Sequence, residues 1–184
     1  MGNTATNCHL LMELKNEHYG IFEKNIESGY ILQVKGSKWS SYYDGNNEGD
    51  IDSTKEIALN LSKELGAKAL LFDIYDSDVF SYYLISNGQV VDHYNSNPNY
   101  FDGGDAIVDY KRNAKKLCDT LNINQCLEEV TEILGKSYVF EDERVEALAE
   151  ALGINPVVAS SGYDDAEDIE DYLEEEIIIK EIGE

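Results

Sequence analysis

Apolar and polar positions alternate most clearly between residues 68 and 101, and this stretch predicts three consecutive β-strands. The apolar run at its start is typical of a strand buried on both faces, and the aromatic and β-branched residues that follow suit a pleated surface. The pair Asn87-Gly88 predicts a tight hairpin turn, because both residue types tolerate the positive φ that such a turn needs. The three strands are expected at residues 69–75, 79–85 and 89–94.

The first part of the chain predicts further strands and one helix. Ser53 or Thr54 is expected to cap the helix, since Ser53 to Glu56 has the form of a capping box, and Gly66 is expected to end it. Strands are expected at residues 21–24, 29–35 and 38–43, whereas residues 8–14 fit either a strand or a helix.

After residue 101 the apolar positions change to helical spacing. Helices are expected at residues 106–121, 123–134 and 142–152. Residues 163–184 begin like a short acidic helix and end in Ile177-Ile178-Ile179, where a returning strand is favoured. Strands followed by helices predict a single α+β domain over residues 1–184, with a strand-rich part (1–101) and a helix-rich, acidic part (102–184). Its mainly antiparallel sheet would have about six strands, with the helices packed on one face.

Charge is the most unusual global property of the sequence. The chain carries 37 acidic and 14 basic residues, for a net charge of -23. Sixteen of the acidic residues and only two of the basic ones lie from Glu141 onward, so the charge is concentrated there. A negative field of this size argues against nonspecific binding to nucleic acid or to an anionic membrane, because both surfaces would repel it.

The three cysteines indicate a reducing compartment. Cys8, Cys118 and Cys126 are odd in number and lack the spacing of a zinc site, so they are interpreted as reduced thiols of a cytoplasmic protein. No stretch near Met1 resembles the apolar core of a signal peptide, and no apolar run approaches the roughly 20 residues of a membrane helix.

Carboxylates near a strand end offer one candidate for chemistry. Asp73, Asp76, Asp78 and His93 could together serve a small metal-dependent hydrolase. The alternative is a turn, where aspartate is favoured because its side chain bonds its own backbone. No nucleophile elbow, phosphate loop or HExxH motif accompanies these residues, so no catalytic residue, metal or cofactor is assigned and the chain is expected not to be an enzyme.

The polar loop from Asp44 to Asp52 resembles the first nine positions of an EF-hand calcium loop. The twelfth position is Lys55 where an EF-hand has its bidentate glutamate, and the element before the loop is a predicted strand. A solvated acidic loop is therefore favoured over a calcium site.

Tyrosines are the second candidate feature, and the chain has 13 of them. In the pairs Tyr42-Tyr43 and Tyr82-Tyr83, successive side chains of a strand point to opposite faces, so one of each pair faces away from the core. Tyrosines exposed among carboxylates are typical of protein interfaces. They could equally cover a second face that helices pack against.

The order of these elements resembles the SUKH-type superfamily of bacterial immunity proteins. The resemblance rests on an Asp76-Ser77-Asp78 break before an aromatic strand, the Asn87-Gly88 turn, strands from Gly29 to Trp39, and the late helix of residues 147–153. It covers most of the chain, and it implies an α+β fold and a role in neutralising a toxin. That family consists mostly of binding proteins, so the resemblance implies no catalytic residue.

The leading hypothesis is an acidic, bacterial, cytoplasmic binding protein that neutralises a basic partner such as a nuclease toxin. A concentrated negative field would steer such a partner, and tyrosines would anchor it. An alternative is a DNA mimic that blocks a DNA-binding protein, which would need carboxylates at about the spacing of duplex phosphates. The expected contact residues are Asp76, Asp78, Tyr82, Tyr83, Tyr163, Asp164, Asp165, Glu167 and Asp168.

Overall fold

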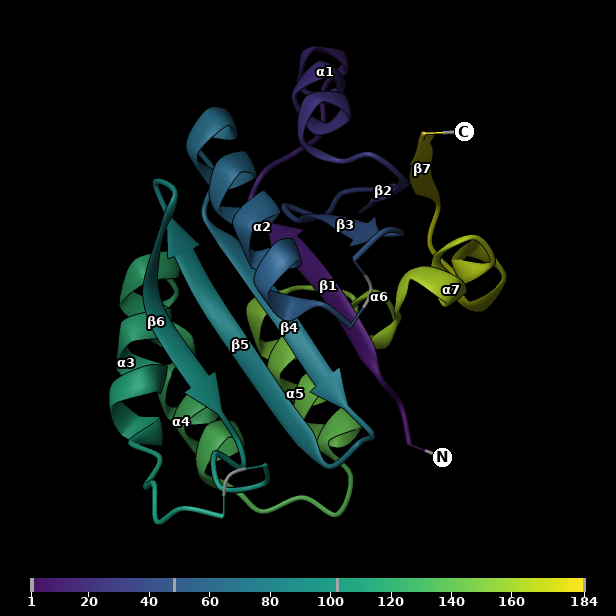
Figure 1. The fold of residues 1–184 in the computed structure, drawn as a ribbon. Coiled ribbons are helices and arrows are strands. Elements are labelled where there is room, and N and C mark those ends of the chain that lie inside the picture. Colours follow the sequence, from purple (N-terminus) through teal and green to yellow (C-terminus); the bar gives the residue numbers. More distant parts are fainter. Residues whose placement is uncertain (1, 48, 102, 184) are drawn as a thin grey trace.

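A computed structural model describes residues 2–47, 49–101 and 103–183, and its centre is one antiparallel sheet (Figure 1). The spatial order of the strands is β6-β5-β4-β1-β3-β2-β7. The strands are β1 (Ala5–Leu10), β2 (Gly29–Val34), β3 (Ser40–Asp44), β4 (Ala69–Tyr75), β5 (Val79–Ser86), β6 (Gln89–Asn95) and β7 (Ile177–Ile182).

Helices cover both faces of this sheet. The α-helices are α1 (Asn16–Asn25), α2 (Ile51–Leu65), α3 (Tyr110–Leu121), α4 (Leu127–Gly135), α5 (Glu141–Leu152), α6 (Pro156–Ser160) and α7 (Tyr163–Ala166), and the short 3-10 helices are η1 (Asn124–Cys126) and η2 (Ile169–Tyr172). Figure 1 shows α2 in front of the sheet and α3, α4 and α5 behind it. The α+β class is confirmed, but helices pack on two faces where one was predicted, and the described sheet has seven strands.

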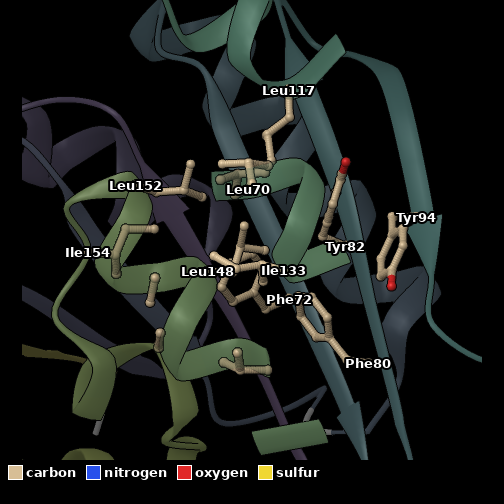
Figure 2. Packing of buried hydrophobic residues seen from close by; sticks show 14 of the residues in the cluster. Leu70, Phe72, Phe80, Tyr82, Tyr94, Leu117, Ile133, Leu148, Leu152 and Ile154 are labelled. Carbon is tan, nitrogen blue, oxygen red and sulfur yellow. The ribbon is translucent and has the colours of Figure 1, made fainter. Parts of the chain in front are cut away.

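The alternation of β4 explains why both faces are covered. Leu70 and Phe72 pack with α3, α4 and α5 in the larger core cluster, which Figure 2 shows from close by. Ala69 and Leu71 point the other way and pack with α1 and α2. A strand that is apolar at successive positions must bury both sides, because its side chains alternate between the two faces.

The predicted strand at residues 21–24 is wrong, because this segment lies inside α1. Phe22 is the buried side chain of α1, and the half-buried Tyr19 and Ile21 pack against the same core cluster. Ile26, which is also buried, follows the helix in extended conformation. The cap of α2 also differs from the prediction. The N-cap residue is Asp50, where Ser53 or Thr54 was predicted, and its carboxylate accepts a hydrogen bond from the Ser53 amide at 3.2 Å. The helix ends as expected at Gly66, which has the left-handed conformation.

The later predicted elements are present with shifted bounds: α3 begins at Tyr110 where residue 106 was expected, and residues 123–134 divide into η1 and α4. The predicted hairpin turn and the final strand are confirmed. Asn87 and Gly88 have φ values of 53° and 73°, as the hairpin between β5 and β6 requires. The end of the chain returns to the sheet, where β7 pairs antiparallel with β2 from Gly29–Ile182 to Val34–Ile177. Within the described residues, no helix is long and apolar enough to cross a membrane.

Candidate functional site

The acidic segment, defined here as residues 163–176, runs over the surface beside β2 and β3 as α7 and η2. Two buried side chains, Ala166 and Ile169, fix it against Leu32 and Tyr43 of the sheet. The Gly162 amide donates to the Asp165 carboxylate at 3.1 Å and so caps α7. The segment is therefore held on the core although it consists mostly of charged residues.

The acidic residues of the acidic segment are all exposed. Asp164, Asp165, Glu167 and Asp168, which the sequence predicted as contacts, are exposed, as are the carboxylates that follow them up to Glu176. Among the described residues, the ion pair between Glu176 and Lys35 is the one that joins this segment to a cation. The negative field is thus largely uncompensated by the protein itself.

Tyr163 connects the acidic segment to the sheet. Its ring lies 5.4 Å from the ring of Tyr30, and it also packs against Gly45, where an added Cβ would come within 2.7 Å of the ring. Burial and the charges of Glu167 and Glu181 raise the pKa of Tyr30. Tyr163 is therefore half-buried and acts as an anchor of the segment as well as part of its surface.

A groove on the α2 side of the sheet is the second surface feature. In Figure 1, α2 lies in front of the upper part of β4 and β5, and the lower part of these two strands extends beyond the start of the helix. The register places Asp73 opposite Thr6 and Ser81, and Tyr83 opposite His93, so these side chains share one face. The groove has a volume of about 340 Å³, and we define it by Asp73, Tyr75, Ser81, Tyr83, His93 and Phe101.

Exposed aromatic side chains gather at this groove, where Tyr75 and Phe101 belong to the lining and Tyr100 packs on both of them from outside it. Tyr75, Tyr100 and Phe101 are 44%, 41% and 66% exposed. The Phe101 ring lies 5.1 Å from Tyr75 and 5.0 Å from Tyr100, in edge-to-face contacts. The Tyr100 hydroxyl donates to the Asp78 carboxylate at 3.1 Å, so aromatic and acidic groups meet at the rim.

The lining of the groove includes ionisable groups with shifted pKa values. Burial raises the pKa of the Asp73 carboxyl, although a hydrogen bond from Thr6 at 3.1 Å partly opposes this shift. The His93 ring stacks on Tyr83 at 4.2 Å, and burial lowers its pKa. The Lys55 ammonium lies 4.9 Å from the centre of the Tyr83 ring.

The structure separates the two predicted tyrosine contacts. Tyr83 is half-buried and lines the groove. Tyr82 is 0% exposed and points to the opposite face, where its hydroxyl donates to Asp92 at 3.1 Å and its ring stacks on Tyr94 (Figure 2). The predicted partner contact through Tyr82 is therefore wrong, because this side chain is buried in the core cluster beneath α3.

Asp76 and Asp78 lie exposed at the β4–β5 turn, beside the rim of the groove. Asp76 and Ser77 both have positive φ, 49° and 57°, so this turn has the same handedness as the Asn87-Gly88 turn. The Asp76 carboxylate accepts from the Gly2 amide at 2.8 Å, which ties the start of the chain to the turn. These residues form the turn that was the alternative to a catalytic pair.

The postulated metal site does not assemble in the part of the chain that the structure describes. Asp73 and His93 line the groove, whereas Asp76 and Asp78 lie at the turn, and no group of three or more potential ligands converges there or elsewhere in residues 2–47, 49–101 and 103–183. In the loop that resembles an EF-hand, Asp44 is buried and accepts from the Asn46 amide at 3.0 Å, and Asp50 caps α2. Both carboxylates therefore have structural roles.

Two other hollows have mainly structural linings. One, of about 480 Å³, contains Arg144, whose buried guanidinium pairs with Glu141 at 2.6 Å and donates to the last carbonyls of α4. The other, of about 790 Å³, lies beside Trp39, whose indole N–H donates to the Leu152 carbonyl at 2.9 Å. In both cases the notable polar groups already have partners within the fold.

Tyr75 and Phe101 are exposed residues of the groove that sequence reasoning did not select. Tyr75 ends a strand whose earlier residues are buried, and Phe101 follows the Pro98 turn, so each stands in a position that usually carries a polar residue. That contrast was the available signal. The contact between the two rings depends on how the loop after β6 folds back, which no local pattern specifies.

Comparisons with known proteins add no relative to this description. No family model, no curated protein and no solved structure matches the chain.

Proposed function

We propose that this chain is an acidic binding protein of the bacterial cytoplasm that neutralises a basic partner, as an immunity or antitoxin-like protein does. The observation that carries the proposal is the acidic segment, an array of exposed carboxylates anchored on the sheet by Ala166 and Ile169. The order of elements along the chain, which resembles that of SUKH-type immunity proteins, also favours an immunity protein.

The physical basis is electrostatic steering. A net charge of -23 attracts a positively charged protein over roughly the Debye length of about 8–10 Å at physiological salt. Steering of this kind raises the association rate more than it raises affinity. The aromatic wall of the groove would then supply the buried contact area, since aromatic side chains are the usual anchors of interfaces.

The test is direct binding to the product of a neighbouring toxin gene, with a growth-protection assay in parallel. A segment variant carries four neutral replacements in the acidic segment: Asp164→Asn, Asp165→Asn, Glu167→Gln and Asp168→Asn. A matched control removes four exposed charges from α4 and α5: Glu128→Gln, Glu129→Gln, Glu132→Gln and Glu146→Gln.

The segment variant should associate at least about tenfold more slowly at low salt, while the control variant should change far less because its charges are remote from the contact. Raising the salt from about 50 mM to about 500 mM should shrink the difference between wild type and the segment variant. Equal association rates for all three proteins, or a wild-type rate that salt does not affect, would contradict the proposal.

A further inference from the structure

Asp73 is a carboxylate in an unusual position on the α2 side of the sheet. Its neighbours in the register, Thr6 and Ser81, are uncharged, and Thr6 donates a hydrogen bond to one of its oxygens at 3.1 Å. Within the described residues, no ion pair involves Asp73. A half-buried carboxylate without a cation is costly unless an external group compensates it.

The walls around Asp73 suit a cation as well. Tyr75, Tyr83 and Phe101 line the same groove, and the faces of such rings attract positive charge. The Lys55 ammonium, 4.9 Å from the Tyr83 centroid, already uses one of these rings in this way. The groove volume of about 340 Å³ is near the lower end for ligand pockets, which are typically about 300–1,000 Å³, so it fits a single side chain.

We propose that this groove binds the guanidinium group of an arginine side chain on the basic partner. The proposal rests on the function proposed above and names the group that the partner presents. A guanidinium is planar, stacks on aromatic rings, and donates in a fork that can reach both the Asp73 carboxylate and the Ser81 hydroxyl. An ammonium is a compact, strongly hydrated point charge and would use the planar aromatic walls less well.

Lys55 is an internal competitor in this arrangement. Its ammonium is held by Asp52 at 2.6 Å while it lies over Tyr83. A bound guanidinium would share that ring with a like charge, which is unfavourable. Removing the positive charge of Lys55 is therefore expected to strengthen binding, whereas loss of an ordinary surface lysine would leave it unchanged.

The test uses the full chain and a small probe, N-acetyl-arginine amide, followed by ¹⁵N–¹H NMR. Saturable shifts are expected at backbone amides of β4, β5 and β6 around Asp73, Tyr83 and His93. The neutral isostere N-acetyl-citrulline amide should give no saturable shift, and the lysine analogue should bind several-fold more weakly. Asp73→Asn should weaken arginine binding by at least about tenfold, and Lys55→Gln should strengthen it about two- to fivefold.

The control variant is Asp164→Asn, which removes the same charge from the acidic segment and should leave the titration unchanged. Shifts confined to residues 163–176, equal curves for arginine and citrulline, or no effect of Asp73→Asn would each overturn the inference. The two proposals fail separately. If the toxin is retained but the arginine probe does not bind the groove, only the inference falls. If the probe binds the groove and no basic partner is retained, the proposed function falls and the guanidinium site stands.

Discussion

Replacing His9 with glutamine should remove a pH dependence of stability that is built into the core. The His9 ring is buried on the face of the sheet that α5 covers. Its Nδ1 lies 2.7 Å from the Ser41 hydroxyl, and its ring centre lies 5.0 Å from that of Phe72 in an edge-to-face contact. Its Nε2 has no partner in the described part of the chain. Burial lowers the pKa of His9 from 6.5 to about 3, because a charged imidazole would lose its hydration there.

The sign and size of the effect follow from proton linkage. Because the folded pKa is depressed, the unfolded chain binds a proton that the folded chain rejects, so stability falls as pH drops below 6.5. Each pH unit costs about 1.36 kcal/mol, so His9 alone should lower the free energy of unfolding by about 2 kcal/mol between pH 7 and pH 5. This figure requires only that the folded pKa lie about one unit or more below 5, and pH 5 still lies above the sequence pI of about 4.2.

Urea unfolding at the two pH values measures this loss, with the single tryptophan, Trp39, as a buried fluorescent probe. Acidification also protonates many carboxylates, and this changes the stability of both proteins. The informative quantity is therefore the loss of unfolding free energy between pH 7 and pH 5 in wild type minus the same loss in His9→Gln. Ser41→Ala is the matched control. It removes the hydrogen-bond partner of His9 and should lower stability by about 1–2 kcal/mol at both pH values while the pH dependence stays. If His9→Gln loses as much stability on acidification as wild type, His9 is not the buried neutral group described here.

Three further predictions concern buried groups and the groove. Tyr82→Phe should lower the free energy of unfolding by about 1–2 kcal/mol without affecting partner binding, because it removes a buried hydrogen bond and no surface contact. Weakened binding would mean that this side chain reaches the interface. A thiol reagent at pH 8 should label the half-buried Cys126 of the folded protein but not the buried Cys8 or Cys118. Burial raises the pKa of both buried thiols, that of Cys118 to about 11. Mass spectrometry of labelled peptides measures this, and reaction at either buried cysteine would contradict the prediction. Asp73→Asn should raise stability at pH 7, because burial disfavours the charged carboxylate, and urea unfolding that shows a loss would contradict its assignment as an uncompensated charge.

Local sequence identified most strands of the sheet, because alternation or a short apolar run favoured a strand there. It left residues 8–14 open between a strand and a helix, and the structure places β1 over Ala5–Leu10. It failed at α1, where Tyr19, Ile21 and Phe22 were too few apolar positions to distinguish a short helix from a short strand. It also placed all helices on one face. Since β4 is apolar at successive positions, the pattern shows that both sides are buried but does not say which helix covers which side.

Some features of the candidate site could likewise be predicted from local sequence, whereas others depend on contacts between distant segments. The exposure of the acidic segment could be predicted, since so many charges in succession cannot be buried. The choice between Tyr82 and Tyr83 could not, because adjacent residues of a strand exchange faces and either phase fits an aromatic pair. The groove required the register of three strands together with the path of the loop that brings Phe101 to Tyr75.

The loop between β3 and α2 links the groove to the acidic segment. Gly45, at its start, packs against Tyr163 of the segment, while Gly49 and Ile51, at its end, line the groove. Helix α2 begins at Ile51, which lines the groove, so the loop that precedes this helix borders both features. One partner could therefore contact both at once. The acidic segment would then govern how fast the partner arrives, which salt screens, and the groove would govern which side chain is accepted, which depends on shape and on Asp73. Substitutions in the segment should consequently change association rates, whereas substitutions in the groove should change dissociation rates.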